Sequence, residues 1–183
     1  SLFEQILIEG QERGLLSLAM NSTEEPLLFK SIHKRIRMAK VHDVMEVFLT
    51  TNAKLLTVKR LAHLVNTGLT HLLFSVDAAT AETHNKIRFG SDFNHIIKSM
   101  AALKNIRGDN PTPITRASFV KCSLNQHETQ LFVETFRDKV DYIDIQHLGL
   151  YRDLFTELVP DDMTFGDVTS CNQPWTRIVI RPN

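Results

Sequence analysis

Short apolar segments alternate with longer amphipathic segments from Leu15 to Gln146, and this alternation limits the fold more than any other feature of the sequence. The apolar segments have the length of β-strands, and the segments between them have apolar residues at helical spacing. Strands that alternate with helices form a parallel sheet with right-handed crossovers. A closed barrel of such units needs ~250 residues, whereas this chain has 183. The sequence therefore predicts an α/β fold: a partial (βα)n TIM-like barrel of about five parallel strands with crossover helices.

The expected elements begin with a helix and continue as strand–helix pairs. Strands are expected at residues 15–20, 46–51, 72–76, 114–122 and 142–146, and helices at 3–13, 27–40, 57–66, 81–86, 92–107 and 126–138. After Leu150 the alternation stops, and an acidic, loop-like region that contains Pro160 follows. We therefore expect two parts, a partial barrel at 1–150 and, at 151–183, a linker with the start of an extension.

The strand at 72–76 has an unusual polar end. A short apolar run bounded by polar residues is typical of a strand that is buried on both faces. Ser75 and Asp77 lie at its end, and polar groups at such a position need partners. Ligands of α/β folds bind at the carboxyl ends of the strands. Ser75 and Asp77 are therefore either ligand-binding residues or structural residues. In the structural case, Ser75 bonds to a backbone group and Asp77 caps the helix that follows.

Polar residues follow every expected strand, and a parallel sheet brings them to one edge. They are Thr23, Glu24 and Glu25; Thr50, Thr51 and Asn52; Ser75 and Asp77; Lys121, Ser123 and Asn125; and Asp144, Gln146 and His147. Glu25 can hold an ammonium group, Asp77 can accept from a ribose diol, and Arg88 can hold a carboxylate with its fork of donors. These side chains suit a ligand with an amine, a carboxylate and a sugar, such as an amino-acid nucleoside.

Charge and hydropathy exclude several classes of protein. The formal net charge is zero, which argues against a general nucleic-acid-binding protein. No apolar run approaches the ~18 residues of a membrane span, and the first residues do not form a signal peptide. The two cysteines, Cys122 and Cys171, lie far apart and do not form a secreted disulfide framework. We expect a cytoplasmic protein that binds neither nucleic acid nor membrane.

Six segments, in order along the chain, resemble motifs of one enzyme family. They are Thr23-Glu24-Glu25-Pro26-Leu27-Leu28, which is similar to a Gly-Gly-Glu-Pro-Leu-Leu loop; Leu49-Thr50-Thr51-Asn52-Ala53 with Leu55-Leu56-Thr57; Phe74-Ser75-Val76-Asp77-Ala78; Ile87-Arg88 with Phe93; Phe119-Val120 with Asn125 and Glu128; and Cys171-Asn172-Gln173-Pro174-Trp175. The last of these resembles the opening of a SPASM-type extension. The chain therefore resembles the radical S-adenosylmethionine (radical SAM) enzymes, in their SPASM/twitch subgroup.

The resemblance implies that S-adenosylmethionine binds at the polar edge of the sheet. The residues it assigns to the cofactor are Glu25, Asn52, Ser75, Asp77, Arg88 and Asn125. Glu25 would bind the methionine amine, and Asp77 would bind the ribose hydroxyls. Ser75 and Arg88 would hold the carboxylate or the ribose, Asn52 would lie near the cofactor, and Asn125 would border the adenine.

The resemblance also implies a [4Fe–4S] cluster held by a Cys-x-x-x-Cys-x-x-Cys triplet. The residues from Ser1 onward contain no such triplet, so we expect the triplet and its strand upstream of Ser1. Cys171 is expected to bind an auxiliary iron–sulfur cluster, because such clusters need several thiolates. Cys122 matches no ligand position and is expected to be a buried thiol. Thr23 and Glu24 replace the glycines of the family's loop.

For the full-length protein, the resemblance implies reductive cleavage of S-adenosylmethionine to a 5′-deoxyadenosyl radical, which abstracts hydrogen from a substrate. It implies a reductant such as flavodoxin or ferredoxin, and a peptide substrate follows by analogy. These 183 residues alone are expected to be inactive. Two alternatives remain open. One is a non-catalytic binding module derived from the family, consistent with Thr23 and Glu24. The other is an ordinary TIM-barrel lyase or isomerase that uses Lys121.

Overall fold

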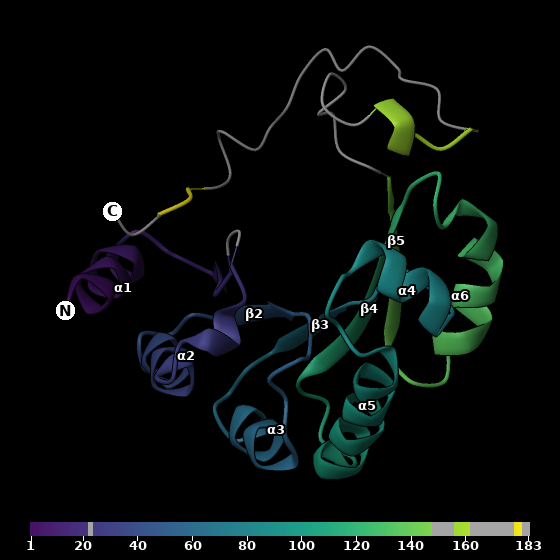
Figure 1. Ribbon diagram of the computed structural model, residues 1–183. Helices are drawn as coiled ribbons and strands as arrows, with labels where there is room; N and C mark the ends of the chain where they lie inside the picture. The colour runs from purple at the N-terminus through teal and green to yellow at the C-terminus, as the bar shows by residue number, and fades with distance from the viewer. Residues whose placement is uncertain (22–23, 148–155, 162–177, 181–183) are drawn as a thin grey trace.

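The strands form a five-stranded parallel sheet in the order of the sequence, as predicted (Figure 1). The computed structural model describes residues 1–21, 24–147, 156–161 and 178–180. The strands are β1 (Ser17–Ala19), β2 (Glu46–Thr51), β3 (His71–Ser75), β4 (Ile114–Lys121) and β5 (Tyr142–His147). Each strand pairs in parallel with the next. Their carboxyl ends therefore share one edge of the sheet.

Helices connect consecutive strands. They are α1 (Leu2–Glu12), α2 (Ile32–Val41), α3 (Val58–Val65), α4 (Ala81–Ile87), α5 (Phe93–Arg107) and α6 (Thr129–Phe136), with 3₁₀ turns η1 (Pro26–Leu28), η2 (Gln126–Glu128) and η3 (Thr156–Leu158). Figure 1 shows α2, α3, α5 and α6 on one side of the curved sheet. This arrangement is the partial barrel that the alternation of strands and helices predicted.

Four of the six described α-helices, α1, α3, α4 and α5, begin where a short polar side chain caps them. Thr57 accepts a hydrogen bond from the backbone of Arg60 at 3.2 Å, and Asp92 accepts one from His95 at 3.0 Å. Such caps satisfy backbone donors that have no partner within the helix. Gly68 follows α3 with φ +83°, and a Cβ there would lie 2.8 Å from Lys40 Cγ. Because a positive φ disfavours a side chain and Lys40 occupies the space a Cβ would need, glycine is favoured at this turn.

Two expected helices are each divided in the structure. Residues 27–40 form η1 and α2, and residues 126–138 form η2 and α6. At η1, Pro26 occupies the first turn and the Glu25 side chain accepts from Leu27 N at 3.1 Å. At η2, Glu128 directs its carboxylate away from α6, toward the start of α4. Glu25 therefore lies at the start of η1, and Glu128 lies at the junction of η2 and α6.

The two faces of the sheet differ in burial. Leu72 and Phe74 of β3 are fully buried beneath the helices, whereas His71, Leu73 and Ser75 on the other face are half-buried. The prediction that this strand is buried on both faces is therefore wrong. Helices cover one face only within the described residues, so alternate side chains along the strand remain partly exposed.

Aromatic side chains fill the core between the sheet and the helices. Phe119 packs against Phe132 with ring centroids 4.8 Å apart, and Phe132 packs against Phe136 at 4.5 Å. Each of these rings is fully buried, and such burial contributes about 1.5–3 kcal/mol per side chain. Cys122 is also buried and free, as expected. The core therefore fixes β4 against α6, and so fixes the edge residues that follow β4.

A short described segment after β5 packs against the end of β4. Leu158 O accepts from Ser123 N at 3.0 Å, and Asp161 Oδ2 accepts from Gln126 Nε2 at 2.7 Å. Most of the region expected to be a linker and an extension, including Cys171, lies outside the described residues. The division at residue 150 therefore stays a prediction. No helix in the described ranges is long and apolar enough to span a membrane.

Candidate cofactor site

Asp77 and Arg88 form an ion pair at the end of β3. Arg88 Nε donates to Asp77 Oδ2 at 2.7 Å, and Arg88 Nη2 makes a second contact with the same oxygen. Val120 N donates to Asp77 Oδ1 at 2.8 Å. The Asp77 side chain is 7% exposed and that of Arg88 is 30% exposed. The buried carboxylate thus fixes the guanidinium, which keeps part of its surface free for a ligand.

Asp77 has a backbone conformation that non-glycine residues seldom adopt. Its φ is +60°, which places it in the left-handed region. The two peptides before it are held by β4, because Val76 N and Asp77 N both donate to Ser118 O, at 3.2 and 3.1 Å. Strained backbone of this kind persists where surrounding contacts fix it, often at binding sites. Here it turns the carboxylate toward both Val120 and Arg88.

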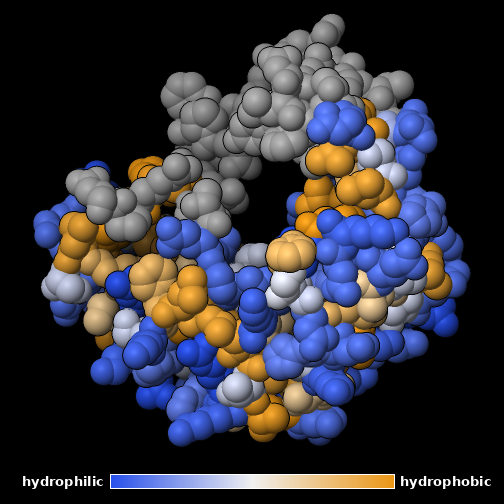
Figure 2. Space-filling view, viewed as in Figure 1, coloured by the Kyte–Doolittle hydropathy of each residue, from blue (hydrophilic) through white to orange (hydrophobic). Residues whose placement is uncertain are grey.

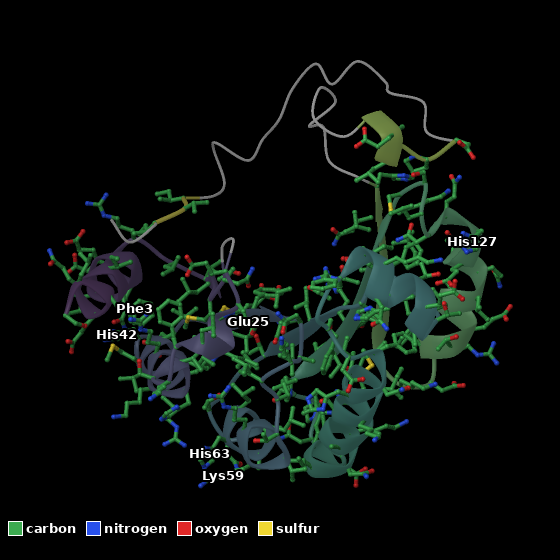
Figure 3. All side chains as sticks on the ribbon, in the orientation of Figure 1. Phe3, Glu25, His42, Lys59, His63 and His127 are labelled. Atoms are coloured by element: carbon green, nitrogen blue, oxygen red, sulfur yellow. The ribbon has the colours of Figure 1, made fainter. Side chains whose placement is uncertain are left out.

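Glu25 lies at the end of β2, where its carboxylate joins two loops (Figure 3). Its Oε1 accepts from Thr51 Oγ1 at 2.8 Å and from Leu27 N at 3.1 Å, and its Oε2 accepts from Asn52 N at 2.8 Å. Oε2 therefore keeps acceptor capacity for an incoming cation. The structure brings Glu25 and Asn52 together, as expected for residues that follow neighbouring strands of a parallel sheet.

Arg60 of α3 supports the same two loops. Its Nη1 donates to Leu27 O at 3.2 Å and to Leu55 O at 3.1 Å. Asn52 accepts from Lys54 N at 3.0 Å through its Oδ1, and Ala53 has φ +63°. The loop after β2 is therefore shaped by local hydrogen bonds and tied to η1.

Asn125 occupies a fully buried position behind the site. Its Nδ2 donates to Asp77 O at 2.8 Å and to Val120 O at 2.9 Å, and its Oδ1 accepts from Cys122 N at 2.7 Å. These contacts use its two amide hydrogens and one of its acceptor positions. The side chain therefore positions the backbone of Asp77 and Val120 and has no exposed surface for a ligand.

Glu128 is a site residue that the sequence placed in a motif without giving it a role. Its Oε1 accepts from Thr80 Oγ1 at 2.6 Å and Thr83 Oγ1 at 2.7 Å, and its Oε2 accepts from Ala79 N at 2.7 Å. Burial raises the pKa of Glu128, but these hydrogen bonds outweigh burial and lower it. The ionised carboxylate thus fixes the loop that leads from Asp77 into α4.

His84 of α4 is fully buried and connects β3 to Arg88. Its Nδ1 lies 2.7 Å from Val76 O, and its backbone carbonyl accepts from Arg88 N at 2.7 Å. Burial lowers the pKa of His84, an effect that the hydrogen bond to Val76 only partly offsets. The ring is therefore neutral at pH 7, with Nδ1–H donating to Val76 O. Its Nε2 has no hydrogen-bond partner among the described residues.

The remaining predicted site residues differ in position. Ser75 lies half-buried on the face away from the helices. Lys121 ends β4. Cys171 lies outside the described residues, so its proposed role as a metal ligand stays a prediction. Within the described ranges, no group of three or more His, Cys, Asp or Glu side chains can hold a metal ion.

The fold and the edge define a class: a partial parallel α/β barrel with a polar ligand site at the carboxyl ends of its strands. A model of the radical SAM superfamily matches residues 2–119, and the chain belongs to this superfamily. Among curated proteins, no relative matches the chain.

Solved structures share the fold at low sequence identity. SuiB of Streptococcus suis, bound to S-adenosylmethionine, matches 86% of this chain and 35% of its own, with 16% identity and a TM-score of 0.70. Native anSMEcpe with bound AdoMet matches 94% and 46%, with 16% identity and a TM-score of 0.63. Coproporphyrinogen III oxidase (HemN) of Escherichia coli, a radical SAM enzyme, matches 85% and 38%, with 13% identity and a TM-score of 0.58. The chain thus spans less than half of each.

Proposed function

We propose that this chain is the cofactor-binding part of a radical SAM enzyme that belongs to the SPASM/twitch subgroup. The observation that carries the proposal is the arrangement of Glu25, Asp77 and Arg88 at one edge of the sheet. A carboxylate with spare acceptor capacity and a partly exposed guanidinium are complementary to the amine and carboxylate of an amino acid. A [4Fe–4S] cluster, once reduced by an external donor, would pass one electron to bound S-adenosylmethionine, and the cofactor would then supply the radical chemistry that removes hydrogen from the substrate.

The residues of this chain bind and orient the cofactor. Glu25 accepts from the methionine ammonium through Oε2, which already accepts from Asn52 N. Arg88 donates to the carboxylate or to a ribose oxygen. Asp77 orients Arg88 and, through the second acceptor position of Oδ1, can accept from a ribose hydroxyl. Asn125 acts indirectly, because it holds Asp77 and Val120 from behind.

The substrate, the partners and the location form the finer part of the proposal. SuiB of Streptococcus suis has been solved bound to the precursor peptide SuiA, and a peptide substrate is proposed here by analogy with that protein. The electron donor is a flavodoxin or ferredoxin, and Cys171 contributes to an auxiliary iron–sulfur cluster. The cytoplasm suits such a protein, since its thiols stay reduced there.

The test uses the full-length parent polypeptide, reconstituted with iron and sulfide without oxygen and then reduced. Electron paramagnetic resonance is recorded before and after addition of S-adenosylmethionine. A [4Fe–4S]⁺ signal that changes on addition, together with formation of 5′-deoxyadenosine, supports the proposal. A cluster whose signal does not change when S-adenosylmethionine is added contradicts the proposal and favours a non-catalytic binding module. Activity that survives without a cluster and is lost in Lys121→Met favours an ordinary TIM-barrel lyase.

A further inference from the structure

The face of the sheet opposite the helices has charged side chains near the candidate cofactor site. The strand register places Ser75, Ser118 and Asp144 in one row across β3, β4 and β5, and it places Arg116 beside Tyr142 in the next. We call this the inner face. Figure 2 shows the molecule hollowed on this side, opposite the helices. The inner face therefore has polar groups where the helix-covered face has a hydrophobic core.

Arg116 and Asp144 form a loose ion pair on the inner face. Arg116 Nη1 lies 3.5 Å from Asp144 Oδ2, and their side chains are 36% and 28% exposed. Gln146 Nε2 donates to the same oxygen of Asp144 at 2.6 Å. Within the described residues, the other guanidinium N–H groups of Arg116 make no hydrogen bond. A long, partly exposed ion pair contributes little to stability, so stability does not explain this arrangement.

This ion pair lies close to Asp77. Ser118 O accepts from the backbone of Asp77 at 3.1 Å, and Ser118 is directly beside Asp144 on the next strand. Neighbouring strands are ~4.8 Å apart, and two residues along a strand span ~6.6 Å. The Arg116–Asp144 pair therefore lies about one strand spacing and two residues from the backbone of Asp77, close enough for one ligand site to adjoin the other.

The chemistry of the ion pair limits the ligand. The free donors of Arg116 match the two oxygens of a carboxylate. Asp144 repels any anion placed beside Arg116, a phosphate dianion more strongly than a singly charged carboxylate, and it accepts a hydrogen bond from an amide N–H. Phe48 and His71 stack nearby, with ring centroids 4.1 Å apart. Burial and the charge of Arg116 lower the pKa of His71, against the opposing effect of Glu46, so its ring is neutral at pH 7.

We propose that the inner face binds an aspartyl or glutamyl residue of the peptide substrate, with its carboxylate on Arg116 and its backbone N–H on Asp144. This inference rests on the proposed function, because it names the substrate of the same site. On binding, the substrate carboxylate replaces Asp144 as the partner of Arg116. The aromatic stack of Phe48 and His71 provides an apolar surface beside it.

The experiment uses the reconstituted full-length protein saturated with S-adenosylmethionine. Two probes differ only in charge: the capped tripeptides acetyl-Ala-Asp-Ala-amide and acetyl-Ala-Asn-Ala-amide. Dissociation constants are measured by ligand-observed NMR for the wild type and for Arg116→Gln and Asp144→Asn. Arg137→Gln is the control, because Arg137 forms a similarly loose ion pair with Asp138, at 3.7 Å, at the end of α6.

The aspartyl probe is expected to bind the wild type about tenfold more tightly than the asparaginyl probe. A charge-assisted hydrogen bond contributes an affinity difference of about this size. Arg116→Gln abolishes the preference, Asp144→Asn keeps or increases it by removing the competing carboxylate, and Arg137→Gln leaves it unchanged. Equal binding of both probes, binding of neither, or a preference that survives in Arg116→Gln overturns the inference. S-adenosylmethionine is titrated separately into each protein. If the wild type does not bind it, the proposed function is contradicted. If the wild type binds it normally but shows no preference between the probes, only this inference is contradicted.

Discussion

Glu128 holds the backbone of Ala79, since its Oε2 accepts a hydrogen bond from Ala79 N at 2.7 Å across a separation of 49 residues. The same carboxylate bonds to Thr80 and Thr83 at the first turn of α4. Arg88 follows the last residue of that helix. Glu128 therefore fixes one end of α4, and the ion pair with Asp77 fixes the other. The position of Arg88 depends on a residue that lies beyond β4.

We expect Glu128→Ala to weaken binding of S-adenosylmethionine by about tenfold, because the loop between Asp77 and α4 loses its tether. It also leaves the N–H groups of Ala79 and Thr80 without partners, which lowers the free energy of unfolding by on the order of 3 kcal/mol. Glu128→Gln is expected to recover most of the affinity, because the hydroxyls of Thr80 and Thr83 can accept from the new amide. Isothermal titration well below the melting temperature measures these affinities.

Asp141→Ala is the matched control for Glu128→Ala. Asp141 bonds to Thr115 N and Oγ1, both at 2.7 Å, and to Arg107, at the opposite end of the same strands. Its loss should lower stability comparably without changing affinity for the cofactor. If both variants lose affinity in proportion to stability, Glu128 is merely structural and the positioning role is wrong.

Arg88→Lys tests the need for a guanidinium at the site. Lysine keeps the charge but cannot make both contacts that Arg88 makes with Asp77. We expect affinity for S-adenosylmethionine to fall about tenfold, measured by titration of the full-length protein. Lys86→Met is the control, because Lys86 is exposed on the same helix and pairs only with Glu82 in the described residues. Equal affinity in the Arg88 variant and the wild type would show that Arg88 does not bind the cofactor.

The stability of the protein should fall in acid because of Asp141. Burial raises its pKa, but hydrogen bonds from Arg107 and Thr115 outweigh burial and lower it to about 2. A carboxyl with a depressed pKa stabilises the fold above its unfolded value and loses that contribution as pH falls from about 4 to about 2. The full shift corresponds to roughly 2 kcal/mol, which we reduce to about 1 kcal/mol because the side chain is 35% exposed.

Urea unfolding at pH 7 and pH 3 measures this contribution in the wild type and in Asp141→Asn. The variant should be less stable at pH 7, and the difference between the two proteins should shrink at pH 3. A difference that stays constant across this range would mean that the ionised form of Asp141 does not stabilise the fold.

Local patterns predict the strands better than they predict the site. Each strand begins and ends within about two residues of its expected bounds, and β2 matches at both ends, because apolar runs and turn residues define strands locally. The contact between Glu128 and Ala79 depends on how β4 and α4 pack together, which no local pattern encodes. The resemblance implies that Asn125 borders the adenine, whereas the structure buries its side chain behind Asp77, a placement that no local pattern encodes either.

The sequence also does not predict that two of the expected site residues form an ion pair with each other. Charge and position in the sequence predict a separate ligand contact for Asp77 and for Arg88. In the structure they bind each other, so one carboxylate and one guanidinium form a single unit of the site. Sequence alone gives the residue types at the edge of a sheet, while the rotamers decide which charges remain available to a ligand.

Glu25→Gln tests the other end of the proposed cofactor site. The substitution keeps one oxygen, which can accept from Asn52 N or from Thr51 and Leu27, but it removes the negative charge and one acceptor. The ammonium of S-adenosylmethionine then loses a charge-assisted hydrogen bond, and we expect affinity to fall about tenfold or more. Glu24→Gln, at the exposed neighbouring residue, should bind as the wild type does. A decarboxylated probe, which keeps the amine but lacks the carboxylate, should lose affinity in Glu25→Gln, and unchanged affinity there would contradict the role proposed for Glu25. If this probe also loses affinity in Arg88→Lys, Arg88 contacts the ribose rather than the carboxylate.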